Sequence, residues 1–218
     1  MTNITNLPPS VSGSSLKILN GFLAADRFVK DLGPAVLGAS KIPTLPTWDN
    51  YRGRERIDIQ NHTIEAFGKY LARIPTLSEM AEAKIALAEA LDCPFDRNLT
   101  RLSVSVMLSA YPAGRPADPE AYFELMLIDL EEAGIQPAAI VAACQHLRRT
   151  SKFLPSISEV LEACRTKLDQ YRTHLRAAEK AIETREKVER LIDRTRTALE
   201  AASDSQDEQR VTDRAKPV

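Results

Sequence analysis

The sequence contains no apolar run near the roughly 20 residues that a helix needs to cross a bilayer. Its first 15 residues have neither the basic region nor the apolar region of a secretory signal. It also lacks the glycine-rich loop that binds phosphates and the Gly-x-Ser-x-Gly turn that presents a nucleophilic serine. We therefore expect a cytoplasmic protein that does not enter a membrane and is not an enzyme.

Metal-binding and disulfide-forming residues are also few. The cysteines are Cys93, Cys144 and Cys164, and the histidines are His62, His146 and His174. A structural zinc site normally has four clustered ligands, whereas Cys144 and His146 are two positions apart on an expected helix and point apart. Three widely spaced cysteines are typical of reduced thiols rather than of a disulfide framework. We expect no metal and no other cofactor.

Glycine is scarce at 8 residues and aromatic residues make up only 6% of the chain, while Ala, Leu, Glu and Arg dominate. This composition favours helices. The hydrophobic fraction of 44% can supply a core, and the net charge of −1 gives no global attraction to nucleic acid or to a membrane. We predict an all-α fold with one or more small helical domains, a long C-terminal heptad helix and disordered termini.

Helix signals and helix breakers divide the chain into regions. We expect disorder at 1–15, a short helix and a linker rich in proline and glycine at 16–55, a helical region at 56–110, a three-helix domain at 111–164, a long helix at 156–200 that includes the last helix of this domain, and a disordered tail at 201–218. The linker carries Trp48, which we expect either to anchor the linker or to belong to a short motif for a partner.

Capping signals predict where several helices begin. Thr76 with Glu79, and Ser156 with Glu159, each have the spacing of a capping box. Asp118 precedes a proline that is tolerated in a first helical turn. The structural motif between the last two helices comprises Phe153, Pro155, Ser156 and Glu159. We expect Phe153 to pack under the helix junction and Pro155 to prevent one continuous helix through it.

The long helix carries a heptad pattern. The predicted seam consists of Leu161, Leu168, Leu175 and Ile182, which repeat every seven residues. A companion set three residues further on consists of Cys164, Tyr171, Ala178, Arg185, Ile192 and Leu199, and the pattern weakens at Arg185 and Glu189. A helix over 156–200 is about 65–70 Å long. We expect it to form a homodimer or to bind another partner.

Two basic groups are candidates for contact with a partner or with nucleic acid. The first consists of Arg148, Arg149 and Lys152, between two helices. These residues either compensate a helix dipole or contact phosphates or an acidic partner. The second consists of Arg165, Lys167, Arg172 and Arg176, offset only by Asp169. Any contact with nucleic acid is expected at these residues. Further basic residues on the long helix alternate with acidic ones, as on a solvated coiled-coil surface.

The stretch from Tyr111 to Cys164 resembles the phage replicative-helicase loader and inhibitor family. The shared scheme is a helix ending in Tyr-Pro, an acid-capped helix with an aromatic residue and leucine pairs, an alanine-rich helix, a basic turn, and Phe-x-Pro-Ser/Thr-Ile-x-Glu before a further helix. In this chain these are Tyr111-Pro112, Asp118 to Leu130, Ala138 to Leu147, and Lys152 to Glu159. About a hundred residues precede the stretch, whereas the family's domain usually stands near its own N-terminus.

The resemblance implies a non-enzymatic adaptor that binds a hexameric replicative helicase of the host or of a phage, blocks premature activity and delivers the helicase to an origin complex. In this interpretation, 111–164 is a scaffold and the long helix from 165 presents the partner surface. Two alternatives remain open. One is a DNA-binding replisome organiser or regulator that uses the basic surface at 148–176. The other is a coiled-coil structural or assembly protein.

Overall fold

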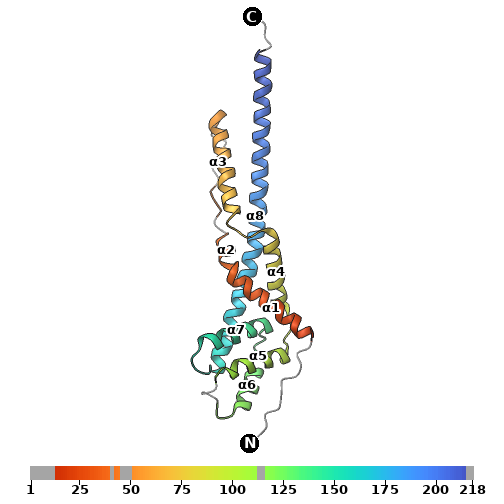
Figure 1. Cartoon of the computed structure of the whole chain (residues 1–218), viewed down its shortest axis with the longest axis vertical. Coiled ribbons are helices and arrows are strands. Elements are labelled where there is room, and N and C mark those ends of the chain that lie inside the picture. Colours follow the sequence, from red (N-terminus) through yellow and green to blue (C-terminus); the bar gives the residue numbers. More distant parts are fainter. Residues whose placement is uncertain (1–12, 40–41, 45–50, 112–115, 215–218) are drawn as a thin grey trace. The chain divides into compact units, whose positions relative to one another are not determined.

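The computed structural model describes residues 13–39, 42–44, 51–111 and 116–214, with side chains placed from 21 to 203 within these ranges. The described residues form helices and no strand, which confirms the all-α prediction (Figure 1). The helices are α1 (Gly13–Asp31), α2 (Gly33–Gly38), α3 (Gly53–Leu71), α4 (Leu77–Asp92), α5 (Arg97–Ser109), α6 (Pro119–Glu132), α7 (Pro137–Thr150) and α8 (Ile157–Arg214). Trp48 and Pro112 lie outside the described residues.

The chain divides into two compact units. The first, here called the core unit, comprises Met1–Pro34 and Ala81–Ala178. The second, here called the paired-helix unit, comprises Ala35–Met80 and Glu179–Val218. Helices α2, α4 and α8 contribute to both units. This division differs from the predicted boundary at residue 110, because α5 belongs to the same unit as α6 and α7.

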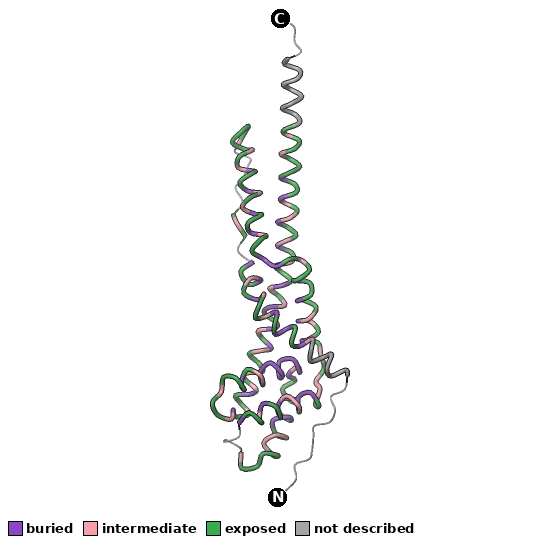
Figure 2. Tube along the Cα trace, in the orientation of Figure 1, coloured by how far each residue is buried: buried purple, intermediate pink, exposed green. Residues whose placement is uncertain are grey.

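The core unit is built around α7. Every residue of α7 from Pro137 to Cys144 is buried (Figure 2), as expected for a helix that is apolar or small on all sides. Around it lies an apolar cluster. Its members include Val104 and Met107 of α5, Met126, Leu127 and Leu130 of α6, Ile140 and Leu147 of α7, and Val160, Cys164 and Leu168 of α8. Each large aliphatic side chain buried in this way contributes about 1.5–3 kcal/mol.

The predicted capping boxes are confirmed. The backbone N–H groups of Thr76 and Ser156 donate to the carboxylates of Glu79 and Glu159 at 2.8 and 2.7 Å. In return, the Glu79 and Glu159 N–H groups donate to the two hydroxyls at 3.2 and 3.4 Å. Asp118 caps α6 as predicted, through Oδ1. Asp96 caps α5 in the same way, a cap that the sequence reasoning did not single out.

Two boundaries differ from the prediction. Helix α8 continues to Arg214 rather than ending near residue 200, so the tail expected to be disordered from 201 is helical up to that residue. The sequence after residue 200 lacks the apolar spacing on which the prediction depended, but a helix that has already formed adds each further turn at little cost. Within the expected linker, residues Gly33–Gly38 form the short helix α2.

The buried stripe of α8 differs from the predicted seam. Of its members, only Leu168 is buried, while Leu161, Leu175 and Ile182 are half-buried. The buried stripe instead follows the companion set and the positions three residues after it: Tyr171, His174, Ala178, Ala181, Val188, Ile192 and Thr195. The heptad period was therefore predicted, but not the set of positions that faces the rest of the chain. The partners decide that choice, and they lie far away in the sequence.

The paired-helix unit consists mainly of α3 and the C-terminal part of α8. Helix α3 buries Gln60, Thr63, Phe67 and Tyr70, at spacings of three and four residues. The C-terminal end of α3 is bonded to Arg185 of α8, and from there α3 runs beside α8 (Figure 1). Both buried stripes extend about 15 Å from this junction, at 1.5 Å per residue. The heptad helix is thus covered over this stretch by a helix of the same chain.

Candidate partner-binding surface

The α7–α8 junction carries three of the predicted basic residues. Arg148 and Arg149 lie in the last turn of α7, and Lys152 lies in the loop that follows. All three are exposed. Among the residues that the structure describes, none of them forms an ion pair. Dipole compensation accounts for the two arginines at the helix end, but Lys152 comes after the helix has ended.

Phe153 continues this basic loop and is 82% exposed. The prediction that it packs under the helix junction was wrong. Leu154 is half-buried and Pro155 is buried, so the chain turns inward only after Phe153. The aromatic ring is instead exposed, in the same short segment as three exposed basic residues.

The loop is held at both ends. The Tyr111 hydroxyl donates to the Leu147 carbonyl at 2.8 Å, in the last turn of α7. The Tyr122 hydroxyl donates to the Pro155 carbonyl, and Ser156 with Glu159 closes the start of α8. Pro155 separates the two helices, as predicted. The exposed loop is therefore short and anchored, so that little conformational entropy is lost when it binds a partner.

A hollow of about 220 Å³ lies next to this loop. It is lined by Ser105, Leu108, Ser109, Tyr111, Pro116, Pro119 and Leu154. Leu154 connects the hollow to the loop, because it directly follows Phe153 in the chain. Drug-sized ligands usually occupy about 300–1,000 Å³, and this hollow therefore has room for one side chain or one flat ring.

Lys167 is not available to a partner. Its ammonium group lies 3.9 Å from the Asp26 carboxylate of α1, and its side chain is only 15% exposed. Asp26 also binds Lys30. Nearby, burial first and the Asp26 charge second raise the pKa of Tyr171. These groups hold α1 against α8 within the core unit, and a sequence motif could not have separated Lys167 from the exposed basic residues.

The remaining predicted basic residues stand on the outer face of α8. Arg165, Arg172 and Arg176 are exposed. Arg172 lies 3.5 Å from Asp169, one turn away on the same helix. Such an exposed pair contributes little to stability, and the arginine can still bind an anion. Of the seven predicted basic residues, Lys167 is thus the one that cannot bind a partner. The α7–α8 loop carries the densest group of the others along the sequence.

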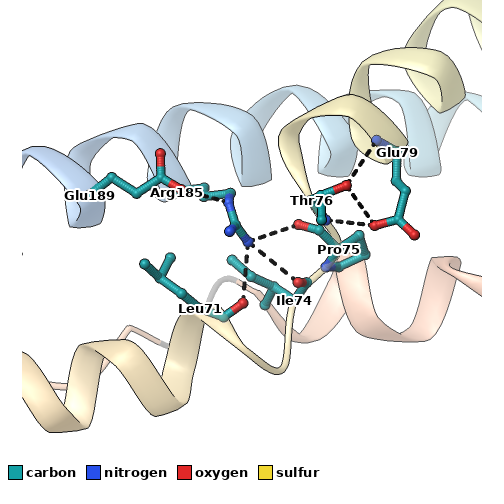
Figure 3. Close-up of polar contacts among 7 residues, drawn as sticks. All are labelled: Leu71, Ile74, Pro75, Thr76, Glu79, Arg185 and Glu189. Atoms are coloured by element: carbon teal, nitrogen blue, oxygen red, sulfur yellow. Dashed lines mark hydrogen bonds and ion pairs between the residues drawn. The ribbon is translucent and has the colours of Figure 1, made fainter.

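Arg185 has a role that the sequence pattern concealed. Its guanidinium Nη1 donates to the carbonyls of Leu71, Ile74 and Pro75 at 3.2, 3.4 and 3.1 Å (Figure 3). Its Nε donates to Glu189 at 2.8 Å. These carbonyls belong to the end of α3 and the turn after it, where backbone acceptors lack helical partners. The weakening of the heptad pattern at Arg185 and Glu189 therefore marks the place where α8 caps α3.

The cysteines are unsuited to nucleophilic chemistry in this structure. Burial raises the pKa of Cys144 to about 12, and burial together with Cys144 raises the pKa of Cys164. Burial also raises the pKa of Cys93. Among the described residues, no three His, Cys, Asp or Glu side chains are grouped so that they could hold a metal ion. None of the described helices has the length and apolar character of a membrane span.

No protein-family model matches this chain, and neither the curated proteins nor the solved structures contain a match to it.

Proposed function

We propose that this chain is a non-enzymatic adaptor of phage DNA replication that binds a hexameric replicative helicase. The observation that supports the proposal is the order of elements from Tyr111 onward. Four features follow one another in the order of the resembled family's scheme. They are the acid-capped helix α6, the alanine-rich helix α7, the proline break and the capped start of α8. These elements form one packed core with α5, as befits a scaffold.

The structure changes where the helicase-binding surface is proposed. The first part of α8 is built into the core unit, because Leu168, Tyr171 and His174 are buried. A truncation near residue 165 would remove this packing and would not report on binding alone. The exposed face further along α8 remains available. Lys180, Lys187 and Arg194 repeat there at intervals of seven residues, and all three are exposed.

A capture experiment with purified components tests this proposal. The full chain is immobilised and offered a purified hexameric replicative helicase after nuclease treatment. We expect capture by the wild type and its loss in K180E/K187E/R194E, because reversed charges repel a surface that the wild type attracts. The matched control K180R/K187R/R194K keeps the charges and should retain capture.

The proposal fails if the wild-type chain captures no helicase, or if the charge-reversed chain captures as much as the control. Circular dichroism of each variant checks that the helix content is unchanged. Sedimentation of the free chain separates the adaptor from the coiled-coil assembly alternative, since an assembly protein forms large oligomers and an adaptor remains small.

A further inference from the structure

We propose that the α7–α8 loop, residues 148–153, is a binding site for single-stranded nucleic acid. Phe153 would stack on an unpaired base, and Arg148, Arg149 and Lys152 would bind the adjoining phosphates. This site goes beyond the proposed helicase binding, which uses Lys180, Lys187 and Arg194 on α8 rather than the loop before it.

Phe153 carries the inference because its exposure has no structural explanation. A phenylalanine that is 82% exposed leaves a large apolar surface in water, and each square ångström of that surface costs about 25 cal/mol relative to burial. The neighbouring Leu154 and Pro155 turn inward, so the chain could have buried the ring at the same junction. A stacking partner would cover the ring and recover this energy.

The cations are placed to serve the same ligand. Arg148, Arg149 and Lys152 lie within five positions of Phe153, and in the described part of the chain no acidic side chain pairs with any of them. The whole protein has a net charge of −1, so attraction to a polyanion must come from a local group such as this one. The hydrogen bonds of Tyr111 and Tyr122 hold both ends of the loop.

The hollow beside the loop distinguishes nucleic acid from an acidic peptide. Its volume of about 220 Å³ admits one flat ring, and its lining includes the exposed hydroxyls of Ser105 and Ser109. An amphipathic acidic helix would need a row of apolar sites at three- and four-residue spacing. Here one exposed aromatic ring and three exposed cations lie within six consecutive residues, 148–153, which matches the repeat of base and phosphate in a single strand. In a duplex the bases already stack on one another, so that Phe153 would find no free face.

Fluorescence anisotropy tests the site with the purified full chain and a labelled oligothymidylate of about 15 nucleotides, which is near the upper end of known site sizes. We expect measurable binding at low ionic strength. Three neutralised phosphates predict a slope of about −2 in a plot of log K against log salt concentration. F153A should weaken binding about tenfold, as expected for the loss of one stacked base, whereas F153W should bind like the wild type.

R148A/R149A/K152A should abolish most of the binding and flatten the salt dependence. The matched control R54A/R56A/R190A removes the same charge from exposed positions of α3 and α8 and should bind like the wild type. Protection of Cys144 from thiol reagents confirms that each variant remains folded, because this cysteine is buried in the core unit.

Three results would overturn the site. In the first, the loop triple variant binds like the wild type, or the control triple variant loses as much affinity. In the second, duplex DNA of the same length binds as tightly as the single strand, or F153A binds unchanged. In the third, polyglutamate displaces the oligothymidylate at equal charge, which would assign the loop to an acidic protein partner. Helicase capture is measured without nucleic acid, so either proposal can fail alone.

Discussion

One helix, α8, is buried by two different kinds of surface. In the core unit its inward side chains include Val160, Cys164 and Leu168, which join a large apolar cluster. In the paired-helix unit its buried positions include Thr184 and Thr195, and the facing stripe of α3 includes Gln60 and Thr63. The same period therefore supports an apolar core in one unit and a thin, partly polar pairing in the other. The paired-helix unit buries less apolar surface, and we expect it to open first.

The largest expected effect concerns the core unit. Leu130 is completely buried in its cluster, and Leu130→Ala should lower the free energy of unfolding by about 2–5 kcal/mol through lost burial and the cavity left behind. Urea denaturation followed by circular dichroism measures this loss. Leu125→Ala on the same helix is the control, since Leu125 is 53% exposed and should change stability by less than about 0.5 kcal/mol. Similar losses in both variants would contradict the assignment of the core.

Arg185→Met tests whether the paired-helix unit opens independently. The substitution removes the hydrogen bonds to the Leu71, Ile74 and Pro75 carbonyls and should destabilise the α3–α8 pairing by about 1.5–3 kcal/mol, as for hydrogen bonds to a charged group. Hydrogen exchange in α3 should accelerate, while thiol labelling of buried Cys144 stays slow.

Arg190→Met is the control for this prediction, because Arg190 is exposed on the same helix. Unchanged exchange in α3 of the Arg185 variant would show that the bonds do not matter. Faster labelling of Cys144 would show that the two units unfold as one.

Gly33→Ala should have a smaller effect, within the core unit. A Cβ at this position would lie 2.6 Å from Nε2 of His174, and His174 is buried with its Nδ1 bonded to the Gln170 carbonyl at 2.7 Å. Crowding of this kind costs about 1–3 kcal/mol. Gly21→Ala is the control and should raise stability. Nothing lies within 4 Å of its Cβ position, and the gain in helix propensity is about 1 kcal/mol. Thermal unfolding of both variants checks the contrast; a Gly33 variant with raised stability would refute the contact.

The smallest expected effect concerns the two capping boxes. One box lies in each unit, so the same result is expected for both. Hydrogen bonds from the backbone and the hydroxyl of Thr76 lower the pKa of Glu79, and those from Ser156 lower the pKa of Glu159. A lowered folded pKa means that the stabilisation is complete above the unfolded pKa and is lost as the pH falls through the folded one. Carbon NMR titration of the two carboxyl groups should show both low values, and Thr76→Val and Ser156→Ala should each raise one of them selectively. If neither value rises, the boxes do not form in solution.

Local chemistry in the sequence predicted much of this architecture. Caps such as Asp118 and the box at Ser156 act within one turn, so they can be recognised from a few residues. The heptad period of α8 was predicted for the same reason. The orientation of its buried stripe could not be predicted, because it depends on α1, α3 and the other partners of the fold. Long-range packing also decides the exposure of Phe153. It decides the pairing of Lys167 with Asp26 too, which lie 141 positions apart in the sequence.

The continuity of α8 limits the changes in length that its gene can tolerate. Loss of a single codon between Ala181 and Thr184 would rotate every later position by about 100°. Arg185 would then point away from the carbonyls of α3, and Val188 and Ile192 would leave the buried stripe. Loss of seven codons would restore the phase to within about 20°. Insertions and deletions in this stretch should therefore survive best at lengths of about seven or eleven residues, because each leaves a rotation of only about 20°.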